Sequence, residues 1–349
     1  MNNKIEMKLI TQRDLIKAGC FNFKEALKVC ENAFIEYANG NIIFPDKISV
    51  IFNEQNQSRI NCLPAAIKTK NVYGMKWVSV FPENPQKYDV QNLSACIILS
   101  ELQKGFPKVF MEGTLCSNMR TATVGAIAAK YLARKNSKTI GFIGSGEQAK
   151  SHFLAFMNVM DNLEVCKVSS RSKESINKFI MQMEKFYPNV EFIDCGNDYK
   201  EAANSDIIVT AISSQEKVLK AEWIKKGTFY CHVAGLEDEF EVAQKADKIV
   251  CDDWSVVKHR TQTISQMYKQ GLLKDSDIYA NIYEIIIKNK KGRENDDEFI
   301  YFNSVGLSYL DISLSNWMYE KCVEKNVGQE ILLQEKLMFD YNINDIKGE

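Results

Sequence analysis

Apolar and polar residues follow two different periodicities along the second half of the chain. Short runs of β-branched and aromatic residues, which predict buried strands, occur at 139–144, 165–168, 190–193, 206–211, 228–233 and 248–251. Between these runs, apolar residues recur at helical spacing in 148–160, 173–186, 198–203 and 237–246. Strands that alternate with helices in this way are typical of βαβ units. The pattern therefore predicts an α/β fold with a doubly wound parallel sheet.

The first third of the chain has a different pattern. A helix is predicted at 23–38, followed by β-like stretches at 48–52, 58–63, 72–80 and 94–99. Near the end of the chain, a strand at 299–302 precedes an apolar helix at 306–323, which we expect to return to the first unit. We therefore predict an α+β domain of residues 1–130 and 312–349, and a parallel-sheet domain of residues 131–311.

A glycine-rich turn follows the first strand of the predicted parallel sheet. Gly144-Ser-Gly-Glu-Gln-Ala149 has the spacing Gly-x-Gly-x-x-Ala between a strand and a helix, the context of a Rossmann-type dinucleotide site. Gly144 permits the tight turn, Gly146 lets the backbone approach a pyrophosphate, and Ala149 lets the helix pack closely. The N-terminus of the helix, where Glu147 and Gln148 lie, supplies backbone N–H donors and partial positive charge. The alternative is an ordinary glycine-rich turn, but the intact strand, turn and helix favour a cofactor site.

The end of the second strand indicates which nucleotide binds. Rossmann domains that bind NAD carry an acid there, roughly 20 residues after the glycine turn. This chain has Ser170, Arg171 and Ser172, and a guanidinium with two hydroxyls suits a 2′-phosphate. We therefore expect NADP(H) as the preferred cofactor, with NAD(H) possible; a solvated turn is the alternative. Thr210 and His232 end two further strands, where a parallel sheet opens onto its ligand crevice, and are also candidate cofactor contacts.

Several ionisable residues stand alone among uncharged neighbours. Arg120 lies in a small-residue helix at 114–129, and a buried guanidinium must be paired. Its partner is either a protein carboxylate such as Asp311 or the carboxylate of a substrate, and the residues alone leave both alternatives open. Lys76 interrupts an otherwise uncharged strand, where a solvated strand face would also account for it. For His232, a structural role is favoured over a catalytic one.

Composition narrows the classes of protein. The 349 residues carry 44 basic and 45 acidic side chains, interspersed, so we expect neither a nucleic-acid nor a membrane partner. The first residues lack the pattern of a signal peptide, and no apolar run approaches the roughly 20 residues that span a bilayer, so we expect a cytoplasmic protein. The ten cysteines form no CxxC pair and have no histidine at zinc-ligand spacing. We therefore expect reduced thiols and no metal site.

Five short motifs together resemble the ornithine cyclodeaminase/mu-crystallin family. The resemblance extends over about residues 9–323 and rests on residues 74–77, 119–123, 144–149, 252–254 and 304–307, together with Asp311. Within the family, residues 245–255 and 292–298 are most similar to members that oxidise an N-substituted glutamate in 2,3-diaminopropionate biosynthesis.

The resemblance implies an oxidoreductase of amino-acid metabolism that forms a homodimer through its substrate domain, with the active site between that domain and the nicotinamide. It implies that the catalytic residues Lys76 and Arg120 bind the α-carboxylate of a small amino-acid or imine substrate. Lys47 is a third candidate for this carboxylate, and Asp311 is placed with the substrate. Thr121 and Gly306 are placed beside the cofactor.

One departure from the family pattern bears on the reaction. Cyclodeaminases carry an aspartate in a Gly-Gly-Asp run after the fifth strand, where it transfers protons during ring closure. This chain has Val233 near that position, so we expect hydride transfer instead of lyase chemistry. The leading hypothesis is oxidation of an N-substituted glutamate to an imine, which hydrolyses to 2-oxoglutarate and 2,3-diaminopropionate. The alternative is a ketimine or imino-acid reductase or an amino-acid dehydrogenase; a cyclodeaminase or a non-catalytic NADP-binding protein is less favoured.

Overall fold

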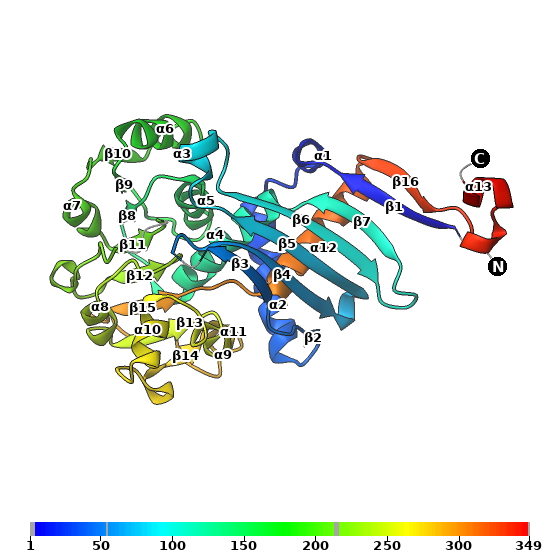
Figure 1. Ribbon diagram of the computed structural model, residues 1–349. Helices are drawn as coiled ribbons and strands as arrows, with labels where there is room; N and C mark the ends of the chain where they lie inside the picture. The colour runs from blue at the N-terminus through cyan, green and yellow to red at the C-terminus, as the bar shows by residue number, and fades with distance from the viewer. Residues whose placement is uncertain (1–3, 54, 213–215, 348–349) are drawn as a thin grey trace. The chain divides into compact units, whose positions relative to one another are not determined.

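The computed structural model describes residues 4–53, 55–212 and 216–347 (Figure 1). The chain divides into two compact units. Unit 1 comprises Met1–Asn22, Gly40–Ser117 and Ser308–Glu349, and unit 2 comprises Phe23–Asn39 and Asn118–Leu307. In the part of the chain that the structure describes, no helix combines the length and apolar character needed to cross a membrane.

Unit 2 is built around an eight-stranded sheet in which every neighbouring pair is parallel. Its strand order is β10-β9-β8-β11-β12-β15-β13-β14. The strands are β8 (Thr139–Ile143), β9 (Val165–Ser169), β10 (Glu191–Asp194), β11 (Ile207–Thr210), β12 (Phe229–His232), β13 (Lys248–Cys251), β14 (Ala280–Asn281) and β15 (Ile300–Asn303). The strand order reverses between β8 and β11, which is the switch point where doubly wound sheets bind ligands. The predicted Rossmann-type sheet is confirmed.

The helices of unit 2 connect and cover these strands. They are α2 (Phe23–Ala38), α4 (Thr114–Leu132, which begins in unit 1), α5 (Glu147–Phe156), α6 (Lys173–Met183), α7 (Tyr199–Ala203), α8 (Phe240–Gln244), α9 (Trp254–Val257), α10 (Thr263–Lys269) and α11 (Ile282–Ile286), with the 3₁₀ turns η2 (Ala221–Trp223) and η3 (Asp275–Asp277). Helix α8 begins three residues later than expected. Its expected first turn is extended instead, because the Glu237 carbonyl accepts hydrogen bonds from the amides of Val218 and Leu219 at 2.9 and 3.0 Å.

The unit boundaries differ from those expected from the sequence. Helix α2 belongs to unit 2 although it precedes the glycine turn by about a hundred residues, because its apolar face, including Cys30 and Phe34, is buried and it packs on α11 and α5. Glu31 on this helix also pairs with Lys130 at 2.8 Å. Unit 2 therefore gains α2 and most of α4, and it ends at residue 307 instead of 311.

Unit 1 is an α+β structure with a mostly antiparallel eight-stranded sheet. Its order is β16-β1-β7-β6-β5-β4-β2, with β3 also paired to β4 and with β1 parallel to β7. The strands are β1 (Ile5–Ile10), β2 (Ile42–Ile43), β3 (Ile48–Asn53), β4 (Ser58–Ile67), β5 (Val72–Val80), β6 (Leu93–Glu101), β7 (Pro107–Glu112) and β16 (Gln329–Gln334). The helices are α1 (Gln12–Lys17), α3 (Asn84–Tyr88), α12 (Ser308–Glu324) and α13 (Ile343–Lys347), with the turns η1 (Lys68–Lys70) and η4 (Met338–Asp340).

The two faces of the unit 1 sheet differ in character. Helix α12 packs on β4 and β5 (Figure 1), and Gly74 allows this approach, since an added Cβ would lie 2.6 Å from Leu99 Cδ2 and 3.0 Å from Ile312 Cδ1. The opposite face, to which Trp77 belongs, carries several exposed apolar side chains. One face therefore forms the core of unit 1, and the other exposes apolar surface.

Candidate nucleotide and substrate sites

The glycine-rich turn joins β8 to α5 at the switch point of the unit 2 sheet. Gly144 has a φ of +110°, and a Cβ there would lie 2.5 Å from the carbonyl oxygen of Ala211, so both conformation and space require glycine. Gly146 is the N-cap of α5, and the space where its Cβ would lie is open to at least 4 Å. The backbone of the turn can therefore be approached closely at the positive end of a ten-residue helix.

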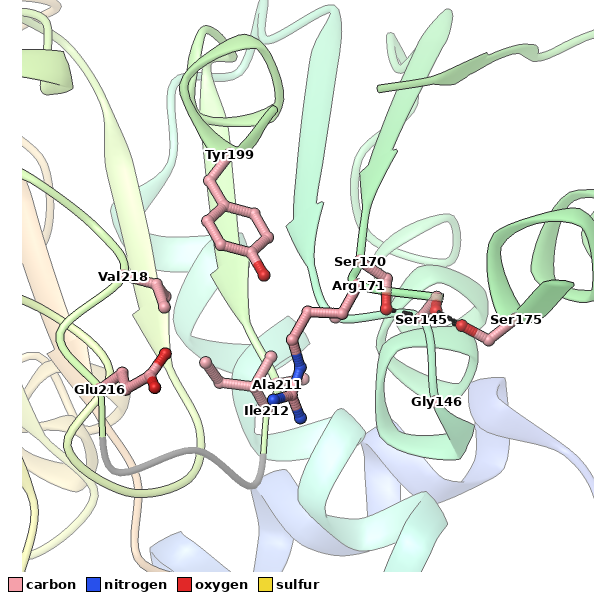
Figure 2. A pocket seen from close by; sticks show the side chains of 11 residues that line it. Ser145, Gly146, Ser170, Arg171, Ser175, Tyr199, Ala211, Ile212, Glu216 and Val218 are labelled. Atoms are coloured by element: carbon pink, nitrogen blue, oxygen red, sulfur yellow. Dashed lines mark hydrogen bonds between the residues drawn. The ribbon is translucent and has the colours of Figure 1, made fainter. Parts of the chain in front are cut away.

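A cavity of about 250 Å³ opens beside this turn (Figure 2). It is lined by the glycine turn, the residues after β9, and segments beyond β10 and β11. The lining residues are Gly144, Ser145, Gly146, Ser170, Arg171, Ser175, Tyr199, Ala211, Ile212, Glu216 and Val218. The structure therefore brings Ser170 and Arg171 to the same cavity as the glycine turn.

Three hydroxyl groups meet on one wall of this cavity. Ser145 Oγ and Ser175 Oγ are 2.6 Å apart, and Ser170 Oγ lies 3.5 Å from Ser175 Oγ. Figure 2 shows these serines together beside Arg171, with Tyr199 and Glu216 across the cavity. Ser145, Ser175 and Tyr199 were not identified from the sequence, because only folding brings them to the end of β9. They could hold a nucleotide ribose or its phosphate together with Arg171.

The other residues of the glycine turn and of the end of β9 that were predicted to bind the nucleotide do not line this cavity. Ser172 caps α6, where its side chain accepts from Ser175 N at 3.2 Å. Glu147 pairs with Lys150 at 2.7 Å, and Gln148 donates to Asn118 Oδ1 at 2.8 Å. None of the three lines the cavity, nor does the fully buried Ala149, which packs α5 closely.

Thr210 and His232 belong to a buried polar cluster at the carboxyl ends of β11 and β12. The Thr210 hydroxyl donates to Glu237 Oε2 at 2.7 Å, and His232 Nε2 lies 3.4 Å from Asp238 Oδ1. Burial lowers the pKa of His232 to about 4 and raises that of Asp238 to about 7, while the pKa of Glu237 is also raised by burial. His232 is therefore neutral at physiological pH and fully buried, which favours the structural role.

Lys76 and Asp311 form a buried ion pair in unit 1. Lys76 Nζ lies 2.7 Å from Asp311 Oδ1 and 3.4 Å from Ser117 Oγ, and the two charged side chains are 1% and 0% exposed. Helix α12 thus supplies a carboxylate to the strand that carries the lysine. Asp311, which was considered as a protein partner for Arg120, therefore forms an ion pair with Lys76.

Two further cations share the sheet face of Lys76. Leu63 on β4 lies directly opposite Lys76, and side chains alternate along a strand, so Arg59 points to the same face. Arg59 is half-buried, burial lowers its pKa, and its Nη1 donates to the Gln57 carbonyl at 2.7 Å. Lys47 immediately precedes β3, and the antiparallel register of β3 with β4, in which Ile48 pairs with Cys62, places Lys47 opposite Leu63. Sequence reasoning missed Arg59, which the two-residue alternation along β4 could have revealed.

Arg120 lies on α4 in unit 2 and is only 8% exposed. Its guanidinium packs against Gly306, since a Cβ on that residue would lie 2.0 Å from Arg120 Nη1. Gly306 has a φ of +81°, so its conformation also requires glycine. Thr121 follows Arg120 on the same helix, and neither Thr121 nor Gly306 lines the cavity beside the glycine turn.

The sheet topology and the glycine turn define a Rossmann-type dinucleotide-binding protein. The chain belongs to the ornithine cyclodeaminase/mu-crystallin family, whose model matches residues 7–326. A Thermococcus litoralis Delta(1)-pyrroline-2-carboxylate reductase, solved with NADH and L-proline, is 33% identical and has a TM-score of 0.88, covering 93% of this chain and 100% of its own. An archaeal alanine dehydrogenase dimer with bound NAD is 33% identical, with a TM-score of 0.85 and coverage of 95% and 100%.

The N-((2S)-2-amino-2-carboxyethyl)-L-glutamate dehydrogenase of Staphylococcus aureus is 28% identical over 332 residues, which cover 94% of this chain and 99% of that protein. These relatives are dehydrogenases and reductases. The predicted family and the predicted enzyme class, an oxidoreductase, are confirmed.

Of the two segments that carried the finer resemblance, residues 245–248 and 292–298 meet at the amino ends of β13 and β15, whereas residues 252–255 follow the carboxyl end of β13. Lys248 Nζ lies 2.9 Å from both Glu294 Oε2 and Glu298 Oε1, and it donates to the Gly292 carbonyl at 2.8 Å. In a parallel sheet this edge is opposite the carboxyl ends, where the glycine turn lies. The part of the resemblance at the amino ends therefore includes a structural ion-pair network.

Proposed function

We propose that the protein transfers hydride between a pyridine nucleotide and the α-carbon of a small α-imino or α-amino acid. The observation that carries the proposal is the glycine turn with its adjoining cavity, in a chain that matches NAD- and NADH-bound oxidoreductases over 93–95% of its length. Open space at Gly146 and the N-terminus of α5 fit the pyrophosphate of such a nucleotide.

The side chains of this protein would bind and orient the substrate. Arg120 would form a bidentate fork on the α-carboxylate, and Lys76 would add a second positive charge, with Lys47 or Arg59 as further candidates for this carboxylate. Asp311 holds the ammonium of Lys76 in place. When bound, the nucleotide supplies or accepts the hydride. The protein contributes by holding the α-carbon in one orientation, which removes much of the entropic barrier.

The carboxylates closest to the position of the missing cyclodeaminase aspartate are engaged elsewhere. Glu237 accepts from Thr210 and from the amides of Ile212 and Ala234, at 2.7, 2.7 and 3.1 Å. Asp238 accepts from Thr263 at 2.5 Å. Both are fully buried, so neither is placed to replace the missing proton-transfer group. This supports hydride transfer over ring closure.

A small imine is the preferred substrate, because the two solved relatives at 33% identity are a pyrroline-2-carboxylate reductase and an alanine dehydrogenase. An N-substituted glutamate, oxidised to an imine that hydrolyses to 2-oxoglutarate and 2,3-diaminopropionate, is the second candidate. It is favoured by the match to the Staphylococcus aureus enzyme over 99% of that protein.

Absorbance of the reduced nucleotide tests these candidates directly. We expect Δ1-pyrroline-2-carboxylate, or pyruvate with ammonium, to oxidise NADPH in the presence of the purified protein. Reduction of NADP+ or NAD+ by N-(2-amino-2-carboxyethyl)-L-glutamate at a higher kcat/KM would favour the second candidate. Failure of all these substrates with both nucleotides would contradict the proposed function.

We further propose that NADP(H) is preferred, through Arg171 and the serines beside it. Arg171→Ala is expected to weaken NADPH binding by about 1–2 kcal/mol, roughly 5- to 30-fold, because an exposed charged hydrogen bond is partly screened. NADH binding should change little. Fluorescence titration of both nucleotides measures the effect, with Lys173→Ala as a control because that nearby exposed lysine pairs with Asp194. Tighter binding of NADH than of NADPH to the wild type would refute the preference.

The exposed apolar face of the unit 1 sheet supports a homodimer. Tyr73 and Trp77 on β5, Phe110 on β7, and Ile48 and Val50 on β3 share this face by register and are 37–67% exposed. Such a contiguous apolar face marks an interaction surface, and the related alanine dehydrogenase is a dimer. We propose that a second copy covers this face.

Trp77→Asp should therefore shift the protein from dimer to monomer in sedimentation velocity, because the carboxylate would be buried without a partner at the interface. Ile16→Asp on α1, where Ile16 is 51% exposed, is the matched control and should leave the dimer intact. A Trp77→Asp protein that remained dimeric at micromolar concentration would place the interface elsewhere.

A further inference from the structure

A buried carboxylate organises the loop that follows β15. Asp252, immediately after β13, is fully buried, and its Oδ2 accepts from the amides of Val305 and Gly306 at 2.9 and 2.8 Å and from Ser304 Oγ at 3.2 Å. Its Oδ1 accepts from the amide of Asp253 at 2.8 Å. One side chain therefore fixes the orientation of two consecutive peptide groups in residues 304–306.

The anchored loop is the surface on which Arg120 rests. The position of a Cβ on Gly306 would lie 2.0 Å from Arg120 Nη1 and 2.7 Å from both Cζ and Nη2, so the guanidinium lies directly against the Gly306 backbone. A rotation of the peptide between Val305 and Gly306 would move this surface into or away from the guanidinium. The orientation of that peptide thus decides where Arg120 can sit.

We propose that Asp252 is a positioning residue for the reaction, which sets the guanidinium of Arg120 through the backbone of Gly306. The inference rests on the proposed function, in which Arg120 binds the substrate carboxylate. It assigns a role to two segments, residues 252–254 and 304–307, that the nucleotide cavity does not use.

Burying the ionised Asp252 carboxylate costs desolvation free energy. Burial raises its pKa to about 6, so the group is ionised at neutral pH at the expense of desolvation. An ionised carboxylate can accept all four hydrogen bonds, whereas an amide in its place offers only one oxygen. A side chain without an oxygen at this position would leave the amides of Val305 and Gly306 without their acceptor.

The neighbouring Asp253 provides a matched control. It is 2% exposed and accepts from Ser255 N, Ser255 Oγ and Tyr37 Oη at 3.0, 2.6 and 3.0 Å, thereby capping α9. Its loss removes the same charge from the same segment. No hydrogen bond of its side chain to residues 304–306 is present in the described part of the chain.

Steady-state kinetics of Asp252→Ala, Asp252→Asn, Gly306→Ala and Asp253→Ala test the proposal. We expect Asp252→Ala to raise KM for the imine at least tenfold, while Kd for the nucleotide changes less than twofold. Asp252→Asn, which can turn its oxygen toward Val305 and Gly306, should recover most of the loss. Gly306→Ala should raise KM similarly, and the Asp252→Ala/Gly306→Ala double variant should be no worse than either single variant, because both act through one contact.

Three kinetic outcomes would overturn the proposal: an unchanged KM in Asp252→Ala, an equal rise in Asp253→Ala, or additive effects in the double variant. If Asp252→Ala does not fold, the Asn and Gly306→Ala variants carry the same comparison.

A second measurement separates this proposal from the proposed function. Labelling of Arg120 by phenylglyoxal, followed by peptide mass spectrometry, needs no turnover. Loss of the loop anchor should accelerate labelling of Arg120 at least severalfold in Asp252→Ala and leave it unchanged in Asp253→Ala. If the wild type turned over no substrate but this difference appeared, the proposed function would fail and the coupling of Asp252 to Arg120 would stand. Equal labelling in all variants would refute the coupling itself.

Discussion

Arg120→Ala is expected to lower kcat/KM for the imine substrate by roughly 30-fold to several thousandfold. The reason is that truncating one member of a buried, hydrogen-bonded charge pair costs about 2–5 kcal/mol, and the substrate carboxylate would lose its bidentate partner. Nucleotide affinity should be retained, since Arg120 does not line the cavity beside the glycine turn. Steady-state kinetics with the imine and fluorescence titration with the nucleotide measure the two effects.

Arg120→Lys is the matched variant for this prediction. It keeps the positive charge and loses the planar fork, so an intermediate kcat/KM is expected. Wild-type kinetics in Arg120→Ala would show that the guanidinium serves packing against Gly306 and does not bind the substrate.

Lys76→Met is expected to lower the free energy of unfolding by about 3–5 kcal/mol, because removing one member of a buried ion pair is strongly destabilising. The 2.7 Å pair is almost completely excluded from solvent, so no water compensates for the loss. A loss of activity in this variant would therefore combine the loss of stability with the loss of a substrate contact. Urea unfolding, measured alongside kcat/KM, separates the effect on stability from the effect on the substrate.

The double variant Lys76→Met/Asp311→Leu distinguishes the two roles of the lysine. Replacing both members of a buried ion pair by apolar side chains is often neutral or stabilising, so most of the lost stability should return. We expect the double variant to fold and to remain inactive, because the substrate carboxylate still lacks Lys76. A stable double variant with wild-type kcat/KM would restrict Lys76 to a structural role.

The sequence by itself determined the parallel sheet, the glycine turn and the position of Arg171. These features depend on local pattern: β8 and α5 follow from hydrophobic periodicity, and Gly144 is required by a turn only a few residues long. The serine and arginine after β9 reach the cavity because neighbouring parallel strands end at the same edge of the sheet.

Only the tertiary structure decided which distant side chains act together. Lys76 and Asp311 are 235 residues apart in sequence, and both were singled out, but nothing in either segment indicates the pairing. The same holds for Asp252 with Gly306, and for helix α2, which joins unit 2 through contacts with α11. The local spacing of apolar residues shows which face of a helix or strand is apolar. It does not record which element will cover that face, because long-range packing is selected by the complementarity of whole surfaces, which no short segment of sequence contains.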